Sequence, residues 1–196
     1  MPHISLKKGL PGIRGPMVFS PESTKPLCDL AEVLLTGPHT LTTAEREMIA
    51  TYVSSQNDCY FCQHAHGAIV VQHLGGQPAD YEFVDAMKRD FETTTLSNKM
   101  KALLNIAGRV QQGGKQVTTA DVERARTVGA TDKEIHDTVL IAAAFCLFNR
   151  YVDGLATWQP QDPEIYREIG QQTAKLGYVG RDYTKSFQTA AANQAE

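Results

Sequence analysis

The 196-residue sequence has no long hydrophobic run. Its longest unbroken apolar stretch, Val139 to Phe148, has ten residues, about half of what a membrane-spanning helix needs. The first residues, Met-Pro-His-Ile-Ser-Leu-Lys-Lys-Gly, do not contain the apolar segment of a secretory signal peptide. These two absences predict a cytoplasmic protein that has no membrane as a partner.

The sequence also lacks an excess of charge of either sign. It has 19 Lys and Arg against 22 Asp and Glu, which gives a net charge of −3 with the histidines neutral. Nucleic-acid-binding domains carry a basic surface, so we expect no nucleic acid as a partner. The length corresponds to one domain, which can bury a hydrophobic core without disulfide bonds.

The sequence has few cysteines, and their spacing divides them into one close pair and two isolated residues. An even count of four is compatible with a disulfide framework, but such frameworks belong to small secreted chains. In a reducing compartment a close cysteine pair is more often catalytic or metal-binding, so Cys59-Tyr-Phe-Cys62 is the first candidate site. We expect the isolated Cys28 and Cys146 to be small buried core residues.

No segment alternates polar and apolar residues over the length of a strand, so the expected fold is all-α. Two capping boxes, Thr42 to Glu45 and Thr131 to Glu134, predict the starts of two helices. Apolar periodicity and the Gly and Pro breakers predict helices over the following segments: 21–36, 43–56, 59–73, 81–89, 96–112, 119–128, 135–155 and 163–176.

The two ends of the chain differ in composition from the middle. Residues 1–20 are rich in Pro and Gly, which predicts an extended N-terminal arm. Residues 21–180 form the expected helical domain. Residues 181–196 end in an Ala-, Gln- and Asn-rich stretch and are predicted to be a frayed tail.

The cysteine pair is expected at the start of a helix for which Asp58 is the N-cap. A rotation of about 100° per residue places Cys59, Cys62 and His66 on one helix face and His64 on the opposite face. The run Cys-x-x-Cys-x-His-x-His therefore cannot easily supply four ligands to one metal ion. A zinc site would need a further ligand from elsewhere, for instance Glu47.

Dithiol chemistry fits this spacing better than metal binding. The helix N-terminus favours a thiolate, and this effect is greatest for Cys59. Cys62 lies four residues before His66, whose imidazole can act as a general base or acid beside the sulfur. A pair spaced by one helical turn can also close into a disulfide with little backbone movement. Which of the two thiols reacts first stays open at this point.

Glu47, eleven further residues, and then Cys59-x-x-Cys62-x3-His66 resemble the signature of the AhpD-like, carboxymuconolactone decarboxylase superfamily, in particular its peroxidase-related branch. The resemblance extends over roughly residues 20–160. It includes the segments Leu41 to Glu47, Gly129 to Ile135 and Phe148 to Leu155.

The resemblance implies an all-helical fold, a trimer or hexamer with its site near a subunit interface, and reduction of hydroperoxides without metal or cofactor. Cys62 would attack the peroxide and Cys59 would resolve the product. His66 and Glu47 would form a proton relay bridged by water, and a lipoylated or thioredoxin-like protein would be the reductant. The sequence departs from some AhpD proteins at Phe61, where they carry a second histidine.

Two alternatives remain at this stage. One is a lyase of the decarboxylase kind, which would use His66 and Glu47 as acid and base while the cysteines take no part. The other is a non-enzymatic oligomer whose cysteine pair senses redox state or binds zinc. Arg150 and Asp153, three residues apart on a predicted helix, are interpreted as an ion pair or as interface residues and not as catalytic groups.

Overall fold

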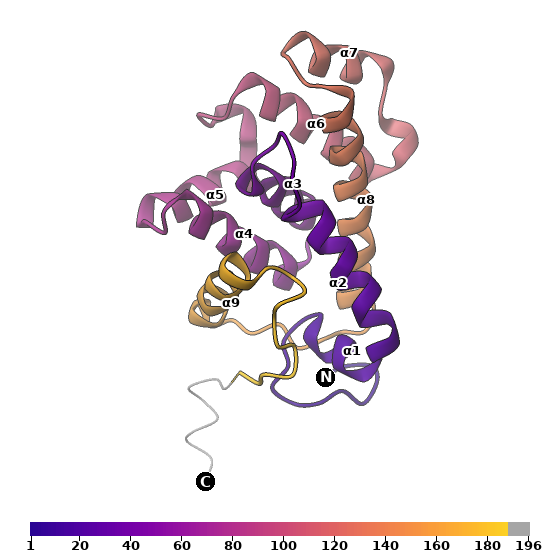
Figure 1. Cartoon of the computed structure of the whole chain (residues 1–196), viewed down its shortest axis with the longest axis vertical. Coiled ribbons are helices and arrows are strands. Elements are labelled where there is room, and N and C mark those ends of the chain that lie inside the picture. Colours follow the sequence, from indigo (N-terminus) through magenta and orange to yellow (C-terminus); the bar gives the residue numbers. More distant parts are fainter. Residues whose placement is uncertain (188–196) are drawn as a thin grey trace.

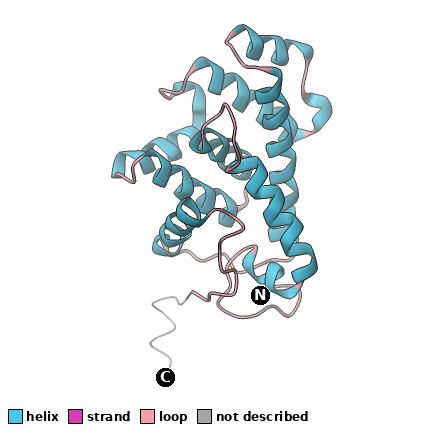
Figure 2. Ribbon diagram, in the orientation of Figure 1, coloured by secondary structure: helices cyan, strands magenta, loops and turns pink. Residues whose placement is uncertain are grey.

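The computed structural model describes residues 1–187, and this part of the chain is helical without any strand (Figure 2). The all-α prediction is confirmed. In chain order, the elements in Figure 1 are α1 (Arg14–Phe19), α2 (Pro21–Leu35), α3 (Thr43–Gln56), α4 (Tyr60–Leu74), α5 (Pro78–Asp90), η1 (Phe91–Thr93), α6 (Asn98–Gln112), η2 (Gly114–Gln116), α7 (Thr119–Thr127), α8 (Asp132–Gly154) and α9 (Pro163–Leu176).

Both predicted capping boxes are present, and they begin the two helices that carry much of the core. The Thr42 backbone N–H donates to the Glu45 carboxylate at 2.8 Å, and Glu45 N–H donates to Thr42 Oγ1 at 3.2 Å. Thr131 and Glu134 repeat this pattern at the start of α8. Each box satisfies backbone donors that a helix start would otherwise leave unpaired.

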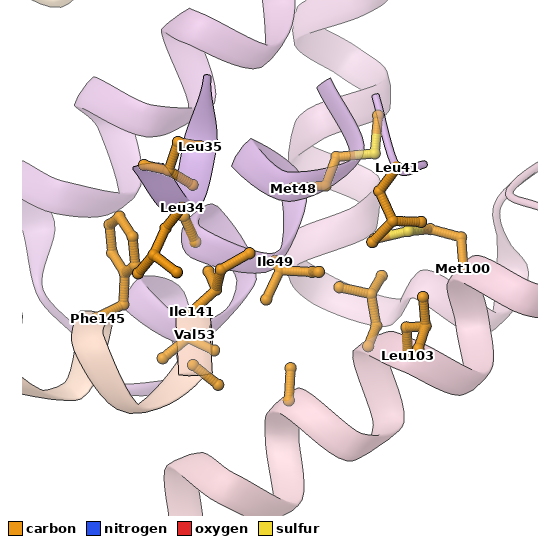
Figure 3. Close-up of a cluster of buried hydrophobic side chains, with 14 of the residues drawn as sticks. Leu34, Leu35, Leu41, Met48, Ile49, Val53, Met100, Leu103, Ile141 and Phe145 are labelled. Atoms are coloured by element: carbon orange, nitrogen blue, oxygen red, sulfur yellow. The ribbon is translucent and has the colours of Figure 1, made fainter. Parts of the chain in front are cut away.

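The main core lies where α3 packs against α4, α6 and α8. Its fully buried side chains are apolar, and Figure 3 shows how those from α3, α6 and α8 converge. Phe145 of α8 belongs to this core and also contacts the side chain of His66 edge-on, with ring centroids 4.6 Å apart. The core therefore supports one wall of the candidate site.

By its length and composition, helix α8 could cross a membrane, although its longest unbroken run of apolar residues is shorter than a membrane-spanning helix needs. More than half of its most apolar part is buried inside the fold. Such burial is typical of the central helix of a soluble protein.

Helix α9 lies against α4 at a position where only glycine fits. A Cβ atom on Gly170 would lie 2.7 Å from the backbone oxygen of Ala68. We expect Gly170→Ala to lower the free energy of unfolding by about 1–3 kcal/mol, because the two backbones must separate to admit the methyl group. Urea denaturation measures this loss.

Gly154→Ala is the matched control, because a Cβ at the end of α8 meets nothing within 4 Å. It should leave the unfolding midpoint nearly unchanged or raise it slightly. Equal midpoints for the two variants would contradict the close contact between α4 and α9.

The chain ends are more ordered than predicted. Residues 14–19 form α1, although the whole segment 1–20 is expected to be extended, and Tyr183 and Phe187 are buried although residues 181–196 are expected to fray. Phe187 N–H donates to the Gly9 carbonyl at 2.8 Å, so the two ends lie together (Figure 1). Mutual burial of their apolar side chains provides the stabilisation that neither segment has alone. The prediction for residues 188–196 lies outside the described residues.

Candidate active site

The cysteine pair stands at the start of α4, with one difference from the prediction. Cys59 and not Asp58 is the N-cap, and the helix begins at Tyr60. Asp58 takes a left-handed conformation, φ 54°, which aspartate tolerates better than most residues. This conformation lets three residues turn the chain from α3 into α4. Both cysteines still lie at the helix N-terminus, as expected.

The two thiols are in contact and deeply buried. Cys59 is 0% exposed and Cys62 is 3% exposed, and all four cysteines of the chain are free thiols. The hydrogen bond to Cys62 and the burial of the sulfur raise the pKa of the Cys59 thiol. Cys59 is thus held in its protonated form, against the expectation that the helix dipole acts most strongly on this residue.

A small apolar cavity of about 50 Å³ lies beside Cys62. Such a volume admits a few water molecules or a peroxide group. Cys59 is not part of its wall. We call it the inner cavity, and its walls are formed by Ile13, Met17, Leu27, Cys28, Ala31, Phe61, Cys62, Ala65, His66, Ile69, Phe145, Phe148, Ile169, Tyr178, Arg181 and Tyr183.

His66 and Glu47 are in direct contact, so the water expected between them is not needed. His66 Nδ1 lies 2.8 Å from a carboxylate oxygen of Glu47, which is 0% exposed. A carboxylate partner fixes the tautomer in which Nδ1 carries the proton. Nε2 is consequently the ring nitrogen that can accept a proton. Since His66 also lines the inner cavity, this base shares the space beside Cys62.

Tyr178 is a member of the site that sequence reasoning missed. Its hydroxyl donates to the other carboxylate oxygen of Glu47 at 2.5 Å and lies 3.2 Å from His66 Nδ1. Burial and the neighbouring Glu47 carboxylate raise the pKa of Tyr178 well above its ordinary value, so it remains a hydrogen-bond donor. Tyr178 follows α9, far from the motif in sequence, and no local pattern marks it.

The remaining candidates are placed as follows. His64 points away from the thiols, as predicted, and pairs through Nδ1 with the Tyr60 carbonyl at 2.7 Å. Cys28 is buried as predicted but also lines the inner cavity, whereas Cys146 is only partly buried. Arg150 and Asp153 do not form the ion pair that was one of the two interpretations, because Arg150 donates to the Cys146 carbonyl and Asp153 accepts from Gln159. Their role as interface residues stays a prediction.

A metal site is not formed by these groups. Among residues 1–187, no three His, Cys, Asp or Glu side chains gather in a way that could hold an ion. The described residues therefore do not favour the zinc-binding alternative.

Solved structures resemble this fold, although neither the protein-family models nor the curated proteins give a match to the chain. An uncharacterized peroxidase-related protein from Silicibacter sp. TM1040 has a TM-score of 0.71 and 27% identity, over 80% of this chain and 78% of that chain. An uncharacterized peroxidase-related protein from Ralstonia eutropha JMP134, described as an alkylhydroperoxidase AhpD core, has a TM-score of 0.71 and 25% identity, over 82% and 81%.

A third structure, from Agrobacterium tumefaciens, is similar in fold. It is a protein of unknown function named for AhpD antioxidant defence, with a TM-score of 0.64 and 21% identity over 75% of this chain and 97% of that chain. The all-helical architecture and the first two structures agree with the resemblance carried by Glu47, Cys59, Cys62 and His66. The fold and these four residues together support an assignment of the chain to the AhpD-like, peroxidase-related superfamily.

Proposed function

We propose that the protein is a thiol-dependent peroxidase that reduces hydroperoxides through a dithiol-disulfide cycle of Cys59 and Cys62. One observation carries the proposal: Cys62 shares an apolar cavity with His66, whose Nδ1 is held by the buried Glu47 carboxylate. A nucleophile, a base and a group that orients the base are the parts that such chemistry requires.

Cys62 is the thiol that attacks. It lines the inner cavity, while Cys59 lies outside that wall and its pKa is raised. After His66 Nε2 takes the Cys62 proton, the thiolate sulfur attacks the terminal oxygen of the hydroperoxide and the O–O bond breaks. The leaving alkoxide takes the proton back from the imidazolium, which gives an alcohol and a sulfenic acid on Cys62. The Glu47 carboxylate stabilises the imidazolium while it carries that charge.

Cys59 completes the cycle. Its sulfur attacks the sulfenic sulfur of Cys62, a disulfide forms, and the released hydroxide leaves as water with the Cys59 proton. Because the two thiols are already in contact in the reduced state, the backbone of Cys59 and Cys62 needs to move little for the disulfide to form. In total, one hydroperoxide and two thiols give one alcohol, one water and one disulfide.

Glu47 also connects this relay with a second hollow. A cleft of about 260 Å³ on the other side of Glu47 is lined by Glu32, His73 and the last turn of α9, among others. This cleft gives the relay a polar route for proton exchange that bypasses the apolar inner cavity.

The partners follow from the burial of the thiols. Because Cys62 is almost entirely covered, a slender dithiol such as a lipoyl arm reaches the disulfide more readily than a broad protein face, although a thioredoxin-like protein remains the second candidate.

A homo-oligomer, a trimer or hexamer, is supported by an exposed apolar stripe on α8 that contains Leu140 and Leu147. A cytoplasmic location fits the need for such reductants.

The thiol count before and after one equivalent of cumene hydroperoxide tests the proposal. We expect two titratable thiols and the mass of two hydrogens to be lost, and peptide mapping should assign the disulfide to Cys59 and Cys62. Cys28 and Cys146 are internal controls and should still react with the thiol reagent after denaturation. An unchanged thiol count would overturn the proposal and favour the lyase alternative, whose activity should resist thiol alkylation.

A further inference from the structure

Arg181 stands between the inner cavity and a larger hollow on the surface. We call the larger hollow the outer cleft. It measures about 510 Å³ and lies between α1, the first part of α2 and residues 179–184. The two spaces share four wall residues, so they adjoin each other at Met17, Cys28, Arg181 and Tyr183.

The Arg181 guanidinium is held in place but is not neutralised. One of its Nη atoms donates to Thr173 Oγ1, and the group lies over the rings of Tyr178 and Tyr183 at 5.6 and 4.8 Å. Its Nε is buried and has no hydrogen-bond partner among the described residues. No carboxylate of residues 1–187 forms a salt bridge with it.

A second guanidinium lies behind the first. Arg14, in α1, is 1% exposed, and it lies 5.7 Å from the Tyr183 ring that Arg181 also contacts. Its hydrogen bonds go to the backbone carbonyls of Asp182 and Lys185, while Nε and Nη2 have no partner in the described part of the chain. Burial and the Arg181 charge lower the pKa of Arg14 to about 10, so Arg14 is still cationic at neutral pH.

The carboxylates nearby are engaged elsewhere. Asp182 accepts from the Thr184 hydroxyl and backbone N–H, and Glu168 pairs with Lys185. In the outer cleft, Lys25 and Asp29 neutralise each other. No carboxylate forms a direct salt bridge with Arg14 or Arg181 among the described residues, although the charges of Asp182 and Glu168 act on Arg14 from a distance. A partly buried cation without a direct partner is stabilised by a bound anion.

We propose that Arg181, reinforced by the charge of Arg14, is a specificity-determining residue that binds the carboxylate of an organic hydroperoxide. This inference rests on the proposed peroxidase function. The hydroperoxide group and the carbon that bears it enter the apolar inner cavity beside Cys62, and the carboxylate end stays at the junction. A guanidinium is suited to this role because it donates two parallel hydrogen bonds to a carboxylate.

Two substrates that differ only in charge test the inference: cumene hydroperoxide and its para-carboxylate derivative. In the wild-type protein, kcat/KM should be on the order of tenfold or more higher for the para-carboxylate substrate than for cumene hydroperoxide. A factor of this size corresponds to the free energy of one hydrogen bond to a charged group. In Arg181→Gln the ratio of the two values should fall to about one, and Arg181→Lys should keep part of the preference. A wild-type ratio near one, or a ratio unchanged in Arg181→Gln, would overturn the inference.

Lys25→Gln is the matched control, because it removes a positive charge from the same outer cleft at a residue already paired with Asp29. The ratio of the two kcat/KM values should survive this change. If the ratio of the kcat/KM values falls as far in Lys25→Gln as in Arg181→Gln, the preference for the carboxylate substrate comes from the overall electrostatic potential of the cleft. The assignment to Arg181 is then wrong.

Calorimetric titration with 4-isopropylbenzoate, which has no peroxide group, separates the inference from the proposed function. Binding to the wild-type protein that is lost in Arg181→Gln supports the carboxylate site even if neither hydroperoxide is turned over. Turnover of both substrates at equal rates, with no binding of 4-isopropylbenzoate, would leave the peroxidase function standing and overturn the carboxylate site.

Discussion

Cys62→Ser is expected to abolish hydroperoxide reduction, with a loss of turnover on the order of 10³-fold or more. The serine hydroxyl is not ionised at neutral pH and is a poor nucleophile toward a peroxide oxygen, whereas the cysteine thiolate is a strong one. Turnover is measured with cumene hydroperoxide as oxidant and dihydrolipoamide as reductant. If Cys62→Ser retains wild-type turnover, the mechanism is wrong.

Cys59→Ser should fail in a different way. Because Cys59 is the N-cap of α4 and serine is a favoured N-cap residue, this variant should fold normally. It should consume about one equivalent of peroxide and stop as a sulfenic acid on Cys62, which dimedone labels. Cys146→Ser, at a thiol outside the inner cavity, is the control and should keep full turnover. Sustained turnover of Cys59→Ser would show that another group resolves the sulfenic acid.

Glu47→Gln is expected to lower kcat/KM by on the order of 10²-fold, while the volume of the side chain is unchanged. The carboxylate accepts one hydrogen bond from His66 Nδ1 and one from the Tyr178 hydroxyl. Tyr178 stays protonated and continues to donate to the amide oxygen, so the amide N–H₂ then faces His66. This arrangement favours the tautomer with the proton on Nε2, which cannot accept the Cys62 proton.

Tyr178→Phe is the matched control for that relay. It removes one donor to Glu47 but leaves the carboxylate and its contact with His66, so we expect a loss of only a few-fold. Because the pKa of Tyr178 is raised well above its ordinary value, Tyr178 does not titrate between pH 6 and 9. The shape of the pH profile of kcat/KM should therefore be the same in wild type and Tyr178→Phe. A profile that changes shape would mean that Tyr178 itself transfers a proton.

The missed features of this site share a physical origin. Tyr178, Arg181 and Arg14 lie in or next to segments that the composition predicts to be irregular. Tyr178 contacts Glu47 and Arg14 contacts the Asp182 carbonyl, and both partners are more than 100 residues away in sequence. Their positions depend on α9 docking on α4 and on the two chain ends packing together. Contacts of this kind depend on buried surface between distant segments, which a local pattern does not record.

The sequence alone determined the helices, their capping boxes and the face of α4 that carries Cys62 and His66, because these features depend on residues within one or two turns of each other. The spacing of Glu47 from the cysteines also indicated the superfamily. Tertiary structure decided which thiol is held protonated, because that depends on burial and on the contact between the two sulfurs. It also decided that Glu47 touches His66 directly and that the ends of the chain close the cavity, since packing between distant segments sets both distances.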